Sequence, residues 1–128
     1  MLKKIYSLWL IITPLLIASI LLFIGGPDYH SPRSLKRFWD MGHVLYFALF
    51  AILLTRWTLI SRMSLIWQWA TVLTLTFLFG VSIELMQYGT TRTPNIGDVL
   101  RDLTGSLLAL VFGPLGTKLH PINRRLSL

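Results

Sequence analysis

The chain has 128 residues, the length of one small domain, of which 54% are hydrophobic and only 13% are charged. A soluble domain carries roughly 25% charged residues to solvate its surface, so the composition excludes an ordinary soluble globule and favours a membrane protein. The net charge of +7 would suggest nucleic acid for a soluble protein, but the basic residues mostly flank apolar runs, as at membrane borders, and we predict no nucleic-acid partner. The lack of cysteine excludes disulfides, cysteine-ligated metals and a thiol nucleophile.

The first apolar run, about residues 5–24, predicts a membrane-spanning helix. A helix needs about 20 apolar residues to cross a bilayer, and this run is uncharged up to Gly25. The start, with Lys3 and Lys4 before the run, is also typical of a signal peptide. Because the run exceeds the usual ~7–15 residues of a signal peptide and no A-x-A cleavage site follows, we expect an uncleaved first span.

Three further spans are predicted at about residues 40–57, 64–88 and 98–117. The run from Ser64 to Ile83 is uncharged, whereas the other two reach the required length only with polar neighbours, so length alone leaves re-entrant or interfacial segments open. Short connections with Gly, Pro and Asn favour helix–helix links. The sequence therefore predicts an all-α fold, a single domain (1–128) that forms a bundle of four transmembrane helices.

The placement of Lys and Arg predicts that both termini are cytoplasmic, because cytoplasmic loops carry an excess of these residues. With the N-terminus inside, the inner side receives the larger share. That side holds Lys3, Lys4, Arg56, Arg62, Lys118, Arg124 and Arg125, and the outer side holds Arg33, Lys36, Arg37, Arg92 and Arg101.

The ionisable residues are predicted to meet at the outer end of the bundle. Carboxylates lie at the start of the second span, near the end of the third and at the start of the fourth, and these ends share one side in either orientation. Intramembrane charges normally face the bundle interior or a wet cavity. We therefore predict a polar pocket formed by Asp40, His43, Glu84, Gln87, Arg92, Asp98, Arg101 and Asp102.

Helical spacing supports this pocket, because residues three or four apart share one helix face. His43 alone would more often be a hydrogen-bonded packing residue, but beside carboxylates a site role is equally open. The pairs that share a face are Asp40 with His43, Glu84 with Gln87, and Asp98 with Asp102.

Simpler structural roles remain open for several of these residues. Asp40 and Asp98 could each cap the start of a helix. Arg101 could pair with Asp98, and Arg92 with Glu84. Glu84 lies near a helix C-terminus, where the helix dipole disfavours negative charge, and this favours a functional or tightly networked role.

Small residues recur every four positions on the fourth predicted span, at Gly105, Ala109 and Gly113. Such a stripe lets another helix approach closely. It predicts either tight packing within the chain or a homo-oligomer.

These motifs, from about Trp39 to Gly113, resemble those of the VanZ-like family of small bacterial membrane proteins. The chain departs from the usual second-span motif, D-K-x-x-H, with Met41 in place of the lysine and one residue fewer before the histidine, and Asp102 stands where Asn is commoner. The matching segments are Asp40-Met41-Gly42-His43-Val44-Leu45-Tyr46, Glu84-Leu85-Met86-Gln87, Arg92 through Asp98, and Gly105.

The resemblance implies a multi-pass protein of the bacterial plasma (inner) membrane and cell envelope. The family's founding association is with low-level resistance to the glycopeptide teicoplanin, and the resemblance implies no particular reaction. The resemblance therefore implies a membrane location and an antibiotic-resistance context for the predicted pocket.

Three function classes follow from the predicted pocket. The first is a binding protein for an envelope component or a membrane-lipid head group, with Arg92 and Arg101 contacting phosphate or carboxylate. The second is a metal-dependent hydrolase or transferase acting on a lipid-linked phosphate, in which His43 and the carboxylates hold a divalent ion. Against it, no strict ligand spacing such as H-E-x-x-H occurs. A transporter ranks third, because the polar groups stop at one end.

Overall fold

The structure is a computed structural model that describes residues 30–89 and 94–118, together with 9, 12–13, 15–20, 22 and 26–27, and the side chains of the last helix as far as Gly113. Within this part of the chain every regular element is a helix, so the all-α prediction is confirmed there. Residues 15–20 and Leu22 are helical and belong to the first predicted span. The long helices and a short connecting one are α2 (Arg33–Arg56), α3 (Thr58–Ser61), α4 (Leu65–Tyr88) and α5 (Ile96–Lys118).

Helix α2 begins earlier than the second predicted span. Hydropathy placed the start near Asp40, but the helix begins at Arg33, directly after Pro32. The intervening turns carry Lys36 and Arg37, which hydropathy excludes from an apolar span although Lys and Arg are good helix formers. Helices α4 and α5 lie close to the predicted ranges 64–88 and 98–117.

The link between α2 and α4 is short and contains the single turn of α3. Trp57 is extended and ends α2, with its backbone N–H bonded to the carbonyl of Leu54. Ser64, also extended, precedes α4. A tight reversal of this kind makes α2 and α4 run in opposite directions, as the sequence predicts for consecutive spans.

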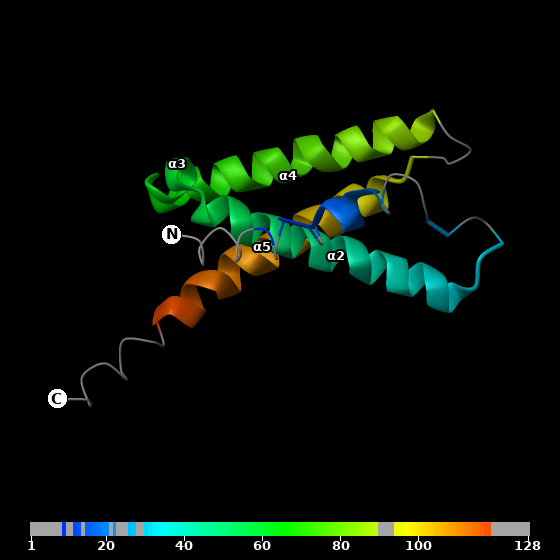
Figure 1. The fold of residues 1–128 in the computed structure, drawn as a ribbon, viewed down its shortest axis with the longest axis horizontal. Coiled ribbons are helices and arrows are strands. Elements are labelled where there is room, and N and C mark those ends of the chain that lie inside the picture. Colours follow the sequence, from blue (N-terminus) through cyan, green and yellow to red (C-terminus); the bar gives the residue numbers. More distant parts are fainter. Residues whose placement is uncertain are drawn as a thin grey trace.

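Helices α2 and α4 converge near α3 and diverge towards the opposite end, where α5 begins between them (Figure 1). Helix α5 crosses α2 and makes its most extensive contact with that helix, and it also packs along α4. The N-terminal part of α5 therefore lies between the C-terminal part of α4 and the N-terminal half of α2.

Gly105 allows the close crossing of α2 and α5. A Cβ atom at this position would lie 2.1 Å from the carbonyl oxygen of Val44, so only glycine fits against that backbone. Ala109, one turn further, is partly buried among apolar residues, whereas a Cβ at Gly113 would meet nothing within 4 Å. The first part of the small-residue stripe thus serves packing within the chain, and the homo-oligomer stays a prediction.

Two apolar clusters hold the helices together. The cluster nearer the α4–α5 connection joins the first predicted span to α2 and α4 through Leu22, Tyr46, Phe47 and Ile83. The other cluster lies towards α3 and joins α2, α3, α4 and α5 through Ala51, Ile60, Val72 and Leu110.

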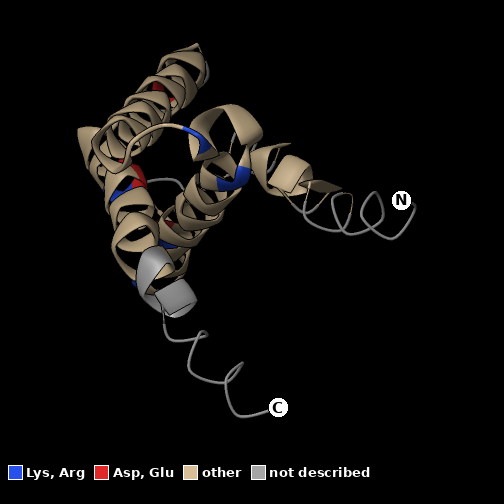
Figure 2. Cartoon of the chain, turned by 90° about the vertical axis from the view of Figure 1, so that its left-hand side faces the viewer, with Lys and Arg blue, Asp and Glu red and all other residues tan. Residues whose placement is uncertain are grey.

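The outer surface of the helices is apolar. Helices α2 and α4 are long and apolar enough to cross a membrane, and only 22% and 28% of their apolar windows are buried inside the protein. A core helix of a soluble protein would be mostly covered, and soluble monomers rarely expose large apolar patches. Figure 2 shows long stretches of helix without Lys, Arg, Asp or Glu, as expected for a surface that contacts lipid.

Candidate functional site

The centre of the candidate site is a buried pair formed by His43 of α2 and Asp102 of α5. The Nδ1 atom of His43 lies 2.8 Å from Oδ1 of Asp102, and each residue is only 1% exposed. Within the described residues, the other ring nitrogen of His43, Nε2, is buried without a hydrogen-bond partner. The pair therefore offers one nitrogen whose hydrogen-bonding capacity is unused.

Gly80 of α4 makes room for the Asp102 carboxylate. A Cβ at position 80 would lie 2.7 Å from Oδ2 of Asp102, closer than real Cβ contacts come. Because α4 has no side chain there, α5 can bring the carboxylate to His43 between the two helices. Nothing in the sequence alone indicated this role for the glycine.

Arg101 connects α5 to α2 at the more exposed side of the pair. Its guanidinium forms an ion pair with Asp98 on its own helix, and it lies 3.3 Å from Oδ2 of Asp40 on α2. The pairing of Arg101 with Asp98 agrees with the structural alternative raised by their spacing. The N-cap alternative for Asp40 is wrong, because α2 begins at Arg33 and Asp40 lies in its interior.

Asn95 ties the start of α5 to α4. Its side-chain oxygen accepts a hydrogen bond from the backbone N–H of Gly97 at 3.0 Å, which is the geometry of a helix N-cap. Its own backbone N–H donates to Oε2 of Glu84 at 2.6 Å. Asn95 rather than Asp98 therefore caps α5, and Glu84, only 6% exposed, belongs to a hydrogen-bond network as its position near a helix C-terminus suggested.

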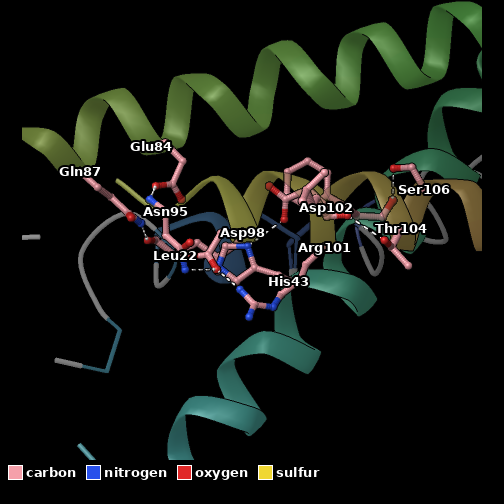
Figure 3. Close-up of polar contacts among 12 residues, drawn as sticks. Leu22, His43, Glu84, Gln87, Asn95, Asp98, Arg101, Asp102, Thr104 and Ser106 are labelled. Carbon is pink, nitrogen blue, oxygen red and sulfur yellow. Dashed lines mark hydrogen bonds and ion pairs between the residues drawn. The ribbon is translucent and has the colours of Figure 1, made fainter. Parts of the chain in front are cut away.

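Gln87 joins the first predicted span to the end of α4. Its amide nitrogen donates to the backbone carbonyl of Leu22 at 2.8 Å, and the side chain is buried. The bond satisfies a carbonyl near the end of the first apolar run. Gln87 thus holds two helices together beside Glu84 (Figure 3).

A second buried polar contact lies one turn further along α5 from the His43–Asp102 pair, towards the middle of the helices. The hydroxyl of Ser106 lies 2.8 Å from that of Thr76 and donates to the carbonyl of Phe47 at 3.1 Å. Ser106 follows Asp98 and Asp102 at intervals of four on α5, so the three share one face. That spacing was the sequence signal for Ser106, which the site prediction missed.

The structure brings the predicted site residues other than Arg92 together from three helices. Arg92 lies outside the described residues. Figure 3 shows most of the remaining residues near one another, and Asp40 joins them through its ion pair with Arg101. We use the name polar cluster for the following residues: Asp40, His43, Glu84, Gln87, Asn95, Asp98, Arg101 and Asp102.

The polar cluster gathers charged and hydrogen-bonding side chains, and its described residues form no evident metal-binding group. Across the described part of the chain, no three or more His, Cys, Asp or Glu side chains are grouped so that they could hold a metal ion. The cluster does combine hydrogen-bond donors, acceptors and charges with the unused Nε2 of His43. Such a set fits recognition of a small polar group.

Comparison with known proteins places the chain in a family. A search of curated proteins and a search of solved structures each give no match. The model of the VanZ/LLP1 family matches residues 4–116, which include α2, α4, most of α5 and every residue of the polar cluster. The chain therefore belongs to the VanZ/LLP1 family.

Proposed function

We propose that this protein crosses the bacterial plasma membrane four times and uses the polar cluster, at the outer end of its helices, to bind an envelope component or a lipid head group. Membership of the VanZ/LLP1 family and the two apolar helices α2 and α4 indicate a membrane protein. The first predicted span, α2, α4 and α5 would be the four crossings, with both termini cytoplasmic.

The observation that carries the binding proposal is the buried His43–Asp102 pair with its unused nitrogen. Polar groups are costly inside an apolar bundle and are usually fully paired there. An unpaired buried nitrogen beside Asp98 and Glu84 is explained if a ligand supplies its missing hydrogen-bond partner. No comparable observation favours the metal-dependent hydrolase or transferase.

Mass spectrometry of the full chain extracted from its membrane tests the binding proposal. We expect a non-protein species to co-purify with the wild type and to be depleted in Glu84→Gln and Asp98→Asn. Thr104→Ala is the control, because Thr104 is exposed and bonds only to its own helix at Leu100. If the wild type and both cluster variants carry the same species in the same amounts, the cluster is not the binding site.

Cysteine labelling tests the crossings of α2 and α4, since the chain has no cysteine of its own. Single variants Ser31→Cys and Gly89→Cys mark the two ends next to the cluster, and Ser61→Cys marks the opposite end in α3. With a membrane-impermeant thiol reagent on intact cells, we expect labelling of the first two and protection of Ser61→Cys. Labelling of Ser61→Cys alone would reverse the orientation, and labelling of Ser31→Cys and Ser61→Cys together would remove the α2 crossing.

The antibiotic context of the family extends the proposal to glycopeptide susceptibility. If the bound component is one that teicoplanin also contacts, expression of the protein should lower teicoplanin susceptibility in a sensitive host. Asp98→Asn should abolish that effect, whereas Thr104→Ala should not. An unchanged susceptibility with well-expressed wild-type protein would separate this chain from the resistance context.

A further inference from the structure

The hydrogen-bond roles at His43 define what is missing from the polar cluster. When Asp102 is ionised its carboxylate only accepts hydrogen bonds, so the Nδ1 atom 2.8 Å away then carries the proton. In the neutral ring the other nitrogen, Nε2, then carries a lone pair and is an acceptor. This acceptor is buried and has no donor within the described part of the chain. A bound molecule with an N–H or O–H group would supply that donor.

The charges around His43 indicate the sign of that molecule. The described residues of the polar cluster include four carboxylates, those of Asp40, Glu84, Asp98 and Asp102, and one guanidinium, that of Arg101. This guanidinium already lies between Asp40 and Asp98. Among these described residues the negative charges outnumber the positive one, so they favour a cation over an anion.

We infer that the ligand of the polar cluster presents a primary ammonium group, the head-group chemistry of phosphatidylethanolamine, and that one of its N–H bonds donates to Nε2 of His43. This inference rests on the proposed binding function and names the chemical class of its ligand. An ammonium supplies both properties that the site lacks, because it is positively charged and has three N–H donors and no acceptor.

The position of the cluster favours a lipid as the source of the ammonium. Glu84 and Gln87 lie in the last two turns of α4, and Asp98 lies in the first turn of α5. The ends of apolar helices lie where lipid head groups meet the hydrocarbon. The ammonium of a phosphatidylethanolamine molecule beside the bundle could therefore reach the carboxylates without leaving the membrane.

Binding of short-chain lipids to the purified full chain, measured in detergent by native mass spectrometry, tests the inference. Phosphatidylethanolamine has an ammonium with N–H donors, phosphatidylcholine has a positive charge without N–H donors, and phosphatidylglycerol has no positive charge. We expect phosphatidylethanolamine to bind at least about tenfold more tightly than either of the other lipids, because one charge-assisted hydrogen bond has an effect of this size.

Variants locate the preference at His43. In His43→Phe, which removes the acceptor and keeps an aromatic ring, the preference for phosphatidylethanolamine over phosphatidylcholine should disappear. His43→Gln, which retains an acceptor, should keep part of it, and Thr104→Ala should keep all of it. The comparison of the three lipids on the wild type decides the inference even if a His43 variant fails to fold.

The outcomes separate the inference from the proposed function. Equal binding of phosphatidylethanolamine and phosphatidylcholine, or tighter binding of phosphatidylglycerol, overturns the ammonium inference but leaves a binding protein. Failure of all three lipids and of phosphoethanolamine to bind removes the ammonium inference, and together with the absence of a co-purifying species it removes the proposed function. Displacement of the lipid by phosphoethanolamine supports a water-soluble amine as ligand, and retention of the lipid supports the membrane source.

Discussion

His43 and Asp102 are 59 residues apart in the chain, yet Nδ1 of the histidine and Oδ1 of the aspartate are 2.8 Å apart where α2 crosses α5. Both side chains are buried, and a third helix leaves the space for the carboxylate at Gly80. The contact couples the packing of three helices to one polar pair. Changes to the pair should therefore affect both the stability of the bundle and the proposed binding.

Breaking the His43–Asp102 pair should destabilise the protein. Asp102→Ala leaves the Nδ1 proton of the histidine buried without an acceptor, which costs about 1–3 kcal/mol of the free energy of unfolding. His43→Phe combined with Asp102→Ala removes both partners, so we expect it to cost less than the sum of the single changes, by about 0.5–3 kcal/mol. Reversible unfolding in mixed micelles measures all three variants, and strictly additive losses would show that the pair is not coupled.

Gly80→Ala should disturb the same pair from the side of α4. The new methyl group would lie 2.7 Å from Oδ2 of Asp102, and overpacking of this kind costs about 1–3 kcal/mol. Gly42→Ala is the matched control, because a Cβ there meets nothing within 4 Å; replacing this interior helical glycine should stabilise by about 0.5–1 kcal/mol. In the Asp102→Ala background the loss from Gly80→Ala should shrink, and an undiminished loss would place the clash elsewhere.

Gly105→Ala should force α2 and α5 apart, because its methyl group would lie 2.1 Å from the backbone oxygen of Val44. A backbone atom cannot move aside as a flexible side chain can, so we expect a loss of about 3 kcal/mol or more. Spin labels on the exposed positions Leu45 and Leu108, introduced as cysteines, would measure the separation of the two helices. An unchanged distance distribution and an unchanged stability would contradict the close crossing.

Gly113 separates packing within the chain from self-association. A Cβ at this position meets nothing within 4 Å, so Gly113→Leu should leave the stability of the single chain nearly unchanged. If the small-residue stripe also joins two copies, the same change should dissociate them. Single-molecule photobleaching in vesicles measures the number of copies, and equal counts for wild type and variant would exclude Gly113 from an interface.

Ser106 and Thr76 allow a graded test of the buried hydroxyls. Ser106→Ala removes the contacts to both Thr76 and the carbonyl of Phe47, whereas Thr76→Val removes only the hydroxyl contact and keeps the side-chain shape. Interhelical hydrogen bonds in membranes contribute about 0.6 kcal/mol on average and at most about 1.7 kcal/mol. Unfolding measurements should therefore give the larger loss for Ser106→Ala, and a larger loss for Thr76→Val would contradict these assignments.

The sequence predicted which ends of the helices meet, but not which side chains pair. Because consecutive spans run in opposite directions, the order of the apolar runs was enough to predict that the carboxylates of three segments lie on one side of the membrane. The spacing of Asp40 and His43 suggested a shared face, yet the first pairs with Arg101 and the second with Asp102. Those partners depend on the rotation and crossing of α2 and α5, which hydropathy does not contain.

Local sequence patterns can predict some of the structural features described above and not others. Asn95, directly before a helical run that opens with Ile96 and Gly97, has the sequence pattern of an N-cap, and the structure places it in that role. The start of α2 was missed because hydropathy detects membrane spans and not helices that extend beyond them. The function of Gly80 depends on an atom of Asp102 on another helix, so no local pattern encodes it.

The contact between Gly105 and Val44 acts as a fulcrum, and the His43–Asp102 bond lies next to it along both helices. When two rigid rods pivot, points near the fulcrum move least. Tilting of α2 in thicker or thinner bilayers would displace its ends at Arg33 and Arg56 while the histidine and the aspartate keep their separation. The geometry of the proposed ligand-binding residues would therefore change less than the positions of the ends of α2.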